Sequence, residues 1–365
     1  MPKTRRATIA DVAAASGVGV GTVSRVINGA PGVRDATRDR VRAAISQLGY
    51  RPSHLAAALS RGTPRTVAIV LPHLTRPSSV ERLAGALAVL ARYEYDTIVC
   101  NVDTPAQRDH VLATLVARHR ADGVIVVSLP LATVDVATRG VPHTVIDDVA
   151  GGRLATDHLL GLGHLRIGFI GDRVQRAVST ALGFTASARR LAGYRQALAA
   201  AGVSPDDDLI RLGPHGPASA QALATELLTL RDPPSAIFAA SDTQAMGVLA
   251  AADQAGAQVP SELSVIGFDD IQSAALLGLS TVRQPLEDSG AQGAERLCAL
   301  LRGETVRPQR QVLELQVMHR ASTTRPGGGR GAPAAAERGP HGRGRPSDTS
   351  GPGRRPAHRA TGRPQ

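Results

Sequence analysis

Apolar residues near the start of the chain recur at the spacing of a short helix. Thr8 can cap a helix that runs to about residue 16, in which Ile9, Val12 and Ala13 share one face. A glycine-rich turn at residues 17–19 follows this predicted helix. The pattern therefore indicates a small helical module at the N-terminus.

Two more helices are predicted after the turn, at about residues 20–28 and 35–48. Gly29 and Gly49 follow their last apolar residues, as is usual where a helix ends. The residues predicted to face inward are Val23, Val26, Ile27, Val41, Ala44, Ile45 and Leu48. Two short helices joined by a tight turn are typical of the helix-turn-helix, whose second helix enters the DNA major groove.

From residue 66 the pattern changes to short β-branched runs that alternate with helical stretches. This alternation predicts parallel sheets covered by helices on both faces. The length suits an α/β body of two doubly wound lobes, with a ligand cleft at the carboxyl ends of the strands. The predicted strands lie at residues 67–71, 97–100, 123–127, 143–147, 167–171, 236–240 and 264–268, and predicted helices lie at 80–93, 106–118, 152–161 and 191–201.

The chain is therefore expected to contain four segments. A helix-turn-helix domain spans residues 1–51, a hinge or linker 52–65, a two-lobed effector-binding and dimerisation domain 66–324, and a tail 325–365. The tail is rich in Arg, Gly and Pro and has no apolar periodicity, so it is expected to be disordered. We interpret it either as a solvated tail or as an arm that adds nonspecific affinity for DNA.

Positive charge is concentrated at the two ends of the chain. Of the net charge of +11, residues 1–65 carry +8 and residues 325–365 carry +7, which leaves the middle at −4. A general overuse of arginine does not explain this change of sign between segments. A polyanion such as double-stranded DNA is the expected partner of the N-terminal segment.

Several classes of protein are disfavoured by the sequence. Its two cysteines, Cys100 and Cys298, lie far apart and lack metal-ligand spacing, which fits a cytoplasmic location and predicts neither a disulfide framework nor a metal site. No apolar run reaches the ~20 residues of a membrane span, and the basic start leads into no signal-peptide core. No nucleophile elbow or phosphate-binding loop is present, so we expect neither an enzyme nor a cofactor.

The N-terminal motifs resemble the lactose-repressor (LacI/GalR) family of transcription regulators. The resemblance rests on Thr-Ile-Ala-Asp-Val-Ala from Thr8, on Thr-Val-Ser-Arg-Val-Ile-Asn-Gly from Thr22, and on Leu-Gly-Tyr-Arg-Pro-Ser from Leu48. It implies that the second helix reads DNA, with Arg25 as the best candidate for guanine and Val20 able to pack on a thymine methyl group. The residues assigned to DNA are Thr8, Val20, Gly21, Thr22, Ser24, Arg25, Asn28, Arg34, Tyr50 and Leu59. Arg34 stands where the family usually has a residue that caps the third helix. This substitution weakens the N-terminal cap of that helix.

The alanine-rich stretch 52–62 has helical spacing but is too short to be stable alone. The resemblance implies a hinge helix that folds when two copies pair on DNA, where Leu59 inserts into the minor groove and kinks it. The alternative is a linker whose leucine packs on the body.

The resemblance continues to about residue 324 and implies the fold of periplasmic sugar-binding proteins. In that fold Arg190 and Asp269 hold ligand hydroxyls or carboxylates, although the two residues could also form a structural ion pair. The residues assigned to the effector are Arg190, Asp269, Asp242, Gln284, Asp147, Ser78 and His215. The ligand is expected to be a small polar molecule, with a sugar or nucleoside-like compound favoured.

The family's stacking platforms for a sugar are poorly represented. Arg76-Pro77-Ser78 replaces an Asn-Pro-aromatic element, and aromatic residues form 2% of the chain, with Phe184 as a candidate substitute. We therefore expect a homodimeric, effector-responsive regulator, most simply a repressor that binds a pseudo-palindromic operator. The alternative is a periplasmic-type solute-binding protein without a role on DNA, which would have no use for residues 1–60.

Overall fold

The computed structural model describes residues 7–50, 65–117, 120–129, 141–173 and 185–327. Leu59, Phe184 and the tail beyond residue 327 lie outside the described residues, so the predictions made for them stay predictions. In the described part, no helix is both long and apolar enough to cross a membrane.

The N-terminal domain consists of three helices, which are α1 (Ile9–Ser16), α2 (Val20–Ile27) and α3 (Asp35–Gln47). Their core contains Val12, Val23 and Val41, each fully buried. The predicted burial of Leu48 is wrong, because α3 ends at Gln47 and Leu48 is 37% exposed. Tyr50 takes the inward place beyond the helix end and belongs to this core.

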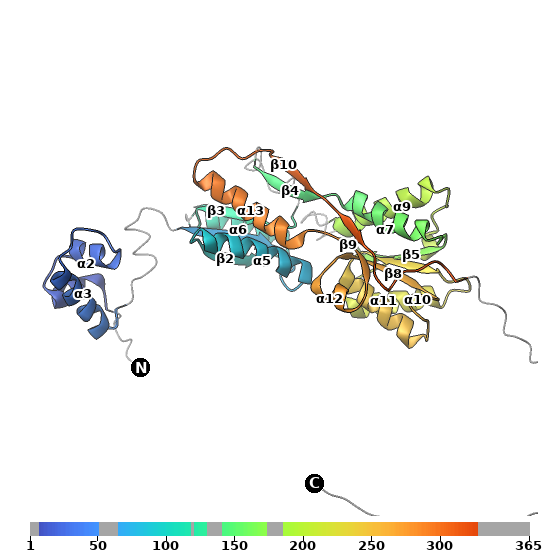
Figure 1. Ribbon diagram of the computed structural model, residues 1–365, viewed down its shortest axis with the longest axis horizontal. Coiled ribbons are helices and arrows are strands. Elements are labelled where there is room, and N and C mark those ends of the chain that lie inside the picture. Colours follow the sequence, from blue (N-terminus) through green and yellow to red (C-terminus); the bar gives the residue numbers. More distant parts are fainter. Residues whose placement is uncertain (1–6, 51–64, 118–119, 130–140, 174–184, 328–365) are drawn as a thin grey trace, which may run out of the picture. The chain divides into compact units, whose positions relative to one another are not determined.

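The first lobe contains a three-stranded parallel sheet in the order β2-β1-β3 (Figure 1). Alternate residues of β1 point to opposite faces, as strand geometry requires. Val67 and Ile69 pack with α5 and α13, whereas Ala68 and Val70 pack with α6. The elements are β1 (Thr66–Leu71), α5 (Pro77–Arg92), β2 (Asp96–Asn101), α6 (Pro105–Ala117), β3 (Gly123–Val126) and, from late in the sequence, α13 (Leu286–Leu301).

Helices α5 and α13 approach each other closely through two glycines. A Cβ atom at Gly85 would meet the backbone of Glu287, and one at Gly290 would meet the backbone of Arg82. Each helix therefore needs a residue without a side chain at the crossing. This contact fixes the first turns of α5, which reach the cleft.

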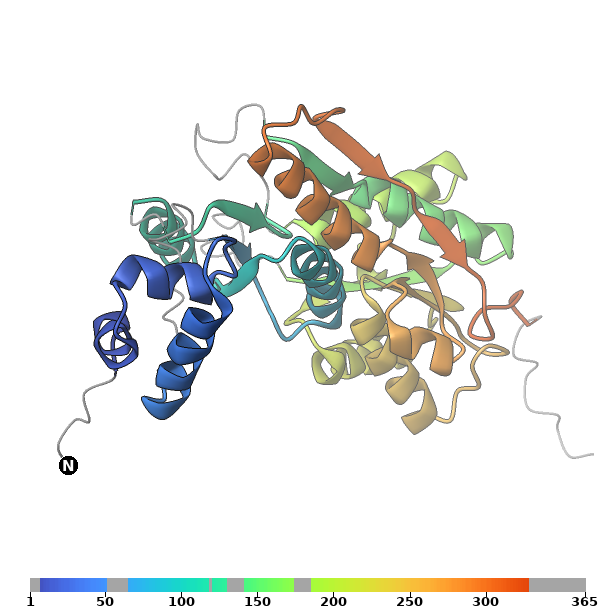
Figure 2. The ribbon, with the colours of Figure 1, turned by 60° about the vertical axis from the view of Figure 1, so that its left-hand side comes forward.

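A separate parallel pair joins β4 (His143–Ile146) to β10 (Arg310–Leu313), as Figure 2 shows. Strand β4 was predicted from its β-branched run, but β10 was not. Within the described residues no ladder joins β4 to β3.

The second lobe is built on a six-stranded sheet in the order β11-β9-β8-β7-β5-β6. Helices α7 and α9 cover one face, and α10 and α11 cover the other (Figures 1 and 2). Strand β11 is antiparallel to β9, a departure from the predicted all-parallel arrangement. The elements are α7 (Asp148–Gly161), β5 (Ile167–Asp172), α9 (Ala186–Ala200), the 3-10 turn η3 (Asp207–Leu209), β6 (Ile210–Gly213), α10 (Pro217–Leu228), β7 (Ala236–Ala239), α11 (Asp242–Gln254), β8 (Ser264–Asp269), α12 (Gln272–Leu276), β9 (Ser280–Arg283) and β11 (Gln316–Met318).

Candidate DNA-binding surface and effector cleft

Helix α1 begins with a capping box. The Thr8 hydroxyl accepts a hydrogen bond from the Asp11 amide at 3.3 Å, and the Asp11 carboxylate accepts one from the Thr8 amide at 2.7 Å. The helix ends at Gly17, whose φ of 64° is left-handed and suits glycine. Thr8 thus has a structural role at this helix start, in addition to the DNA contact predicted for it.

The outward face of α2 carries the residues predicted to contact DNA. Val23 and Val26 point into the core, which leaves Val20 46% exposed and Gly21, Arg25 and Asn28 exposed. Thr22 and Ser24 are half-buried, and the Asn28 amide group donates to the Ser24 hydroxyl at 3.3 Å.

Two further predicted contacts lie outside α2. Arg34 is exposed at the start of α3 and forms no side-chain capping hydrogen bond among the described residues. Tyr50 is 9% exposed and packs in the core of the domain. Its ring therefore has a packing role, and the DNA contact assigned to it stays a prediction.

The cleft lies where the carboxyl ends of strands from both lobes meet. Its lining comes from the loop after β1 and the start of α5, from the ends of strands β3 to β9, and from the first turns of α7, α9 and α11. The polar pocket there has a volume of about 210 Å³. Of the residues predicted for the effector, Arg190, Asp269, Gln284, Ser78 and His215 line this pocket. Parallel α/β proteins bind ligands in this position.

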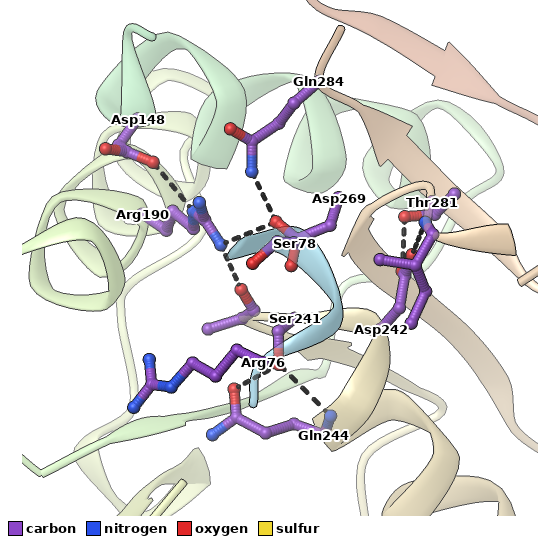
Figure 3. Close-up of polar contacts among 12 residues, drawn as sticks. Arg76, Ser78, Asp148, Arg190, Ser241, Asp242, Gln244, Asp269, Thr281 and Gln284 are labelled. Atoms are coloured by element: carbon purple, nitrogen blue, oxygen red, sulfur yellow. Dashed lines mark hydrogen bonds and ion pairs between the residues drawn. The ribbon is translucent and has the colours of Figure 1, made fainter. Parts of the chain in front are cut away.

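One cluster of polar side chains in the pocket is centred on Arg190, as Figure 3 shows. Its Nε donates to Asp148 Oδ1 at 2.9 Å, and its Nη1 lies 3.5 Å from Asp269 Oδ1 and donates to the Ala240 carbonyl. The guanidinium plane stacks 3.6 Å from the centre of the Phe268 ring. Arg190 is therefore held on three sides.

Asp269 is fixed in an unusual backbone conformation. Its φ of 116° is costly for a residue with a side chain. Burial raises the pKa of its carboxyl group, and the positive charges of Arg190 and Arg82 oppose that rise. Gln284 donates to Asp269 and accepts from Arg82 at 2.7 Å, which links the strained residue to the first lobe.

A second cluster of polar side chains is centred on Asp172, at the end of β5. Its carboxylate lies 3.1 Å from His215 Nδ1, 3.0 Å from Gln244 Nε2 and 3.7 Å from Arg76 Nη1. Burial acts to raise the pKa of Asp172, but the hydrogen bond from His215 and the nearby positive charges lower it below its usual value. Asp172 is therefore a hydrogen-bonded carboxylate at neutral pH.

Two of the residues predicted for the effector do not line the pocket. Asp242 is fully buried and accepts from the Thr281 hydroxyl at 2.6 Å and the Ile271 amide at 2.9 Å (Figure 3). Burial and the charge of Asp269 raise the pKa of its carboxyl well above the ordinary value. Asp147 instead caps α7 by accepting from the Val149 and Ala150 amides. Both carboxyls are occupied in building the lobe.

Sequence reasoning missed several residues that the pocket contains. Asp148 lies in the pocket where its neighbour Asp147 was predicted, and two adjacent aspartates after a strand gave no way to choose between them. The others are Arg76, Arg82, Asp172 and Gln244. Asp172 could have been found from its place directly after the strand predicted at 167–171.

The fold and these two sites define a class of protein, in which a helix-turn-helix domain is joined to a two-lobed ligand-binding body. Residues 8–53 match the bacterial regulatory proteins of the lacI family, and residues 156–323 match a periplasmic binding protein-like domain. The chain is 33% identical to the HTH-type transcriptional regulator CelR of Thermobifida fusca, over 88% of this chain and all of CelR. It is 30% identical to the repressor PurR of Photobacterium profundum, over 85% of this chain and 96% of PurR.

Solved structures agree with the sequence matches. A lac repressor dimer bound to operator and an anti-inducer is similar with a TM-score of 0.74 and 25% identity, covering 88% of this chain and all of that one. A CelR–cellobiose complex gives a TM-score of 0.60 and 32% identity, covering 87% of this chain and all of that one. This chain belongs to the LacI family, and it is a DNA-binding transcription regulator. Its curated relatives are regulators rather than enzymes.

Proposed function

We propose that this protein is a repressor that binds a pseudo-palindromic operator as a homodimer and responds to a neutral, polyhydroxylated metabolite. The observation that carries the choice of ligand is the pairing of charges in the cleft. Arg190 lies between Asp148 and Asp269, and Arg76 lies beside Asp172.

Paired charges of this kind suit hydroxyl groups. A hydroxyl can donate to a carboxylate while it accepts from the adjacent guanidinium, whereas an added anion or cation would disturb the existing pair. A relative supports this choice, since the solved CelR structure is a complex with cellobiose.

On the DNA side, the outward face of α2 supplies the contacts. Arg25 reads a guanine, Val20 and Gly21 lie against base edges, and Thr22, Ser24, Asn28 and Arg34 contact the neighbouring backbone. Leu59 opens the minor groove at the operator centre.

The protein acts in the cytoplasm through four segments. They are the DNA-binding domain (1–51), the hinge (52–65), the effector-binding and dimerisation domain (66–324) and the tail (325–365). A solute-binding protein without a role on DNA is not supported, because the relatives that span nearly the whole chain are regulators.

The experiment that tests the ligand class is a thermal-shift screen of the full-length protein. We expect neutral sugars or polyols to raise the melting temperature, and their phosphorylated or carboxylated counterparts to raise it less. Arg153→Ala is a control outside the pocket, because Arg153 is exposed on α7 and does not line it. A larger shift with the anionic member of each pair would contradict the proposal.

The DNA role is tested by selecting binding sites from random duplexes. A two-fold symmetric consensus is expected, and its affinity should change when the ligand found in the screen is added. An asymmetric consensus, or affinity independent of every ligand that binds, would contradict the proposed repressor.

A further inference from the structure

An ion pair joins the two lobes across the cleft. Arg76 belongs to the first lobe, where it directly precedes α5, and Asp172 belongs to the second lobe, at the end of β5. Arg76 Nη1 lies 3.7 Å from Asp172 Oδ2, and each side chain is 19% exposed. Salt screens a partly buried pair much less than a fully exposed one. The protein's own charges therefore draw the lobes together.

The two carboxylate oxygens of Asp172 have separate partners. Oδ1 lies 3.1 Å from His215 Nδ1 and accepts a hydrogen bond from Gln244 Nε2 at 3.0 Å, and both of these residues belong to the second lobe. Oδ2 is the oxygen that faces Arg76. The Ser187 hydroxyl donates to the Asp172 amide at 2.8 Å, which also holds the backbone. The second lobe therefore orients the carboxylate, and the contact through Oδ2 is the one that leaves this lobe.

The first lobe holds the backbone of Arg76 in a similar way. The Arg76 amide donates to the His73 carbonyl at 2.9 Å, and Pro77 follows as the first residue of α5. Further along, α5 is fixed against α13 at Gly85 and Gly290, where an added Cβ atom would meet the facing backbone. Because the backbone is already fixed on both sides of the cleft, the pair costs mainly the ordering of the Arg76 side chain.

Two other contacts run from the first turns of α5 to the second lobe. The Glu81 carboxylate accepts a hydrogen bond from the Gln272 amide at 3.2 Å, and Arg82 donates to the Gln284 side chain at 2.7 Å. Each of these contacts joins a charged group to a neutral one, whereas the ion pair joins two opposite charges. The attraction between opposite charges falls off slowly with distance, so it acts before the lobes are fully closed.

We propose that Arg76 and Asp172 form an electrostatic latch, which holds the two lobes closed whether or not an effector is bound. Without the latch, a larger fraction of the protein has an open cleft. An effector that binds the closed form then has a lower apparent affinity, because that affinity is reduced by the fraction of competent protein. The latch thus sets the baseline of closure on which any effector acts, and the inference goes beyond the choice of ligand.

Double electron–electron resonance between two spin labels measures the separation of the lobes in the full-length protein. Ala113 on α6 and Ala199 on α9 are exposed, lie in different lobes and do not line the cleft. A ketone-bearing amino acid at both positions accepts the labels and leaves Cys100 and Cys298 in place. Coexpression with an excess of unlabelled chain confines the two labels to one subunit of a dimer. No ligand and no DNA are added.

We expect the wild type to give one dominant distance. Arg76→Gln and Asp172→Asn should each enlarge the population at longer distances by about threefold or more. The double variant should resemble the single ones, because each single change already removes the pair. Arg76→Lys keeps the charge and should keep most of the closed population. Arg211→Gln is the matched control, since this half-buried arginine pairs with Glu226 inside the second lobe.

Wild-type distances in both neutral variants would overturn the latch. A double variant that opens by the sum of the two single effects would also overturn it, because each residue would then act through other partners. Equal opening in Arg211→Gln would contradict it as well, since the loss of any ion pair would then suffice. None of these results bears on the ligand class or on the role on DNA, because neither ligand nor DNA is present.

Discussion

The outward face of α2 and the effector cleft are both polar, but the protein builds them in different ways. The residues on α2 come from one segment of eight residues, and Val20, Gly21 and Arg25 are exposed. The cleft takes its residues from segments between His73 and Gln284, and most of its charged side chains, such as Arg190 and Asp172, are held in ion pairs.

The pairs in the cleft give ligand binding a way to act on the rest of the protein. Several pairs cross from one lobe to the other, including Arg82 with Gln284 and Arg76 with Asp172. A ligand that changes these pairs changes how the lobes are held, whereas a contact on α2 leaves the core of its domain intact. Differential contacts of this kind are what couple a ligand to a distant site.

The largest effect is expected from removing the centre of the cleft. Arg190→Ala leaves the half-buried Asp148 and the buried Asp269 without their shared cation, and breaking a buried pair costs about 3–5 kcal/mol. Urea denaturation of the full-length protein measures the loss. The exposed Arg189→Ala should change the free energy of unfolding by no more than about 0.5 kcal/mol. Equal stability of the two variants would show that the pairs are dispensable.

A substitution on the outward face of α2 should change the affinity for DNA rather than the stability of the protein. Arg25→Ala is expected to cost about 1–3 kcal/mol of specific DNA binding, and to leave unfolding unchanged because the side chain is exposed. Fluorescence anisotropy on a selected site and on scrambled DNA measures the specific and the nonspecific affinity. Arg42→Ala, an exposed arginine on α3, is the control. An equal loss on scrambled DNA would mean that Arg25 only neutralises phosphate.

The same contrast explains what the sequence could predict. The helix-turn-helix depends on local signals, such as Thr8 three residues before Asp11 and glycines at helix ends, so its elements were predicted almost residue by residue. The cleft depends on long-range assembly. Arg190 and Asp269 were identified through the family resemblance, and the pairing of Arg76 with Asp172 follows only from the arrangement of the lobes.

Adjacent candidates were the hardest to separate. Asp147 and Asp148 have the same chemistry, but one caps α7 and the other binds Arg190. Asp242 follows a strand as a ligand residue would, yet its side chain points inward to Thr281. Side-chain direction at the first turn of a helix decided these cases, and residue type carries little information about it.

A smaller effect is expected at the start of α1. Thr8→Ala removes half of the capping box and should destabilise that helix by about 1 kcal/mol, whereas Thr8→Ser keeps the acceptor oxygen. Hydrogen exchange of the α1 amides in the full-length protein measures the change. Exchange rates that are the same for Ala and Ser would show that the cap contributes nothing there.

The smallest effect is a dependence of stability on pH that comes from the second lobe. His164 is buried; its Nε2 donates to the Thr324 carbonyl at 2.8 Å, and its Nδ1 lies 2.8 Å from the Ser235 hydroxyl. Burial lowers the pKa of His164 below its ordinary value. Between the two pKa values the unfolded chain binds more protons than the folded one, so this group favours folding above about pH 6.5 and loses that contribution as the pH falls.

Urea denaturation between pH 7.5 and 5.5 measures this dependence. His164→Gln should be less stable at pH 7.5 and should also lose part of the decline that wild type shows on acidification. The exposed His110→Gln is the control, and it should keep the wild-type profile. A His164→Gln profile parallel to that of wild type would mean that His164 binds the same number of protons in the folded and unfolded states, and that the lower stability of the variant reflects lost hydrogen bonds alone.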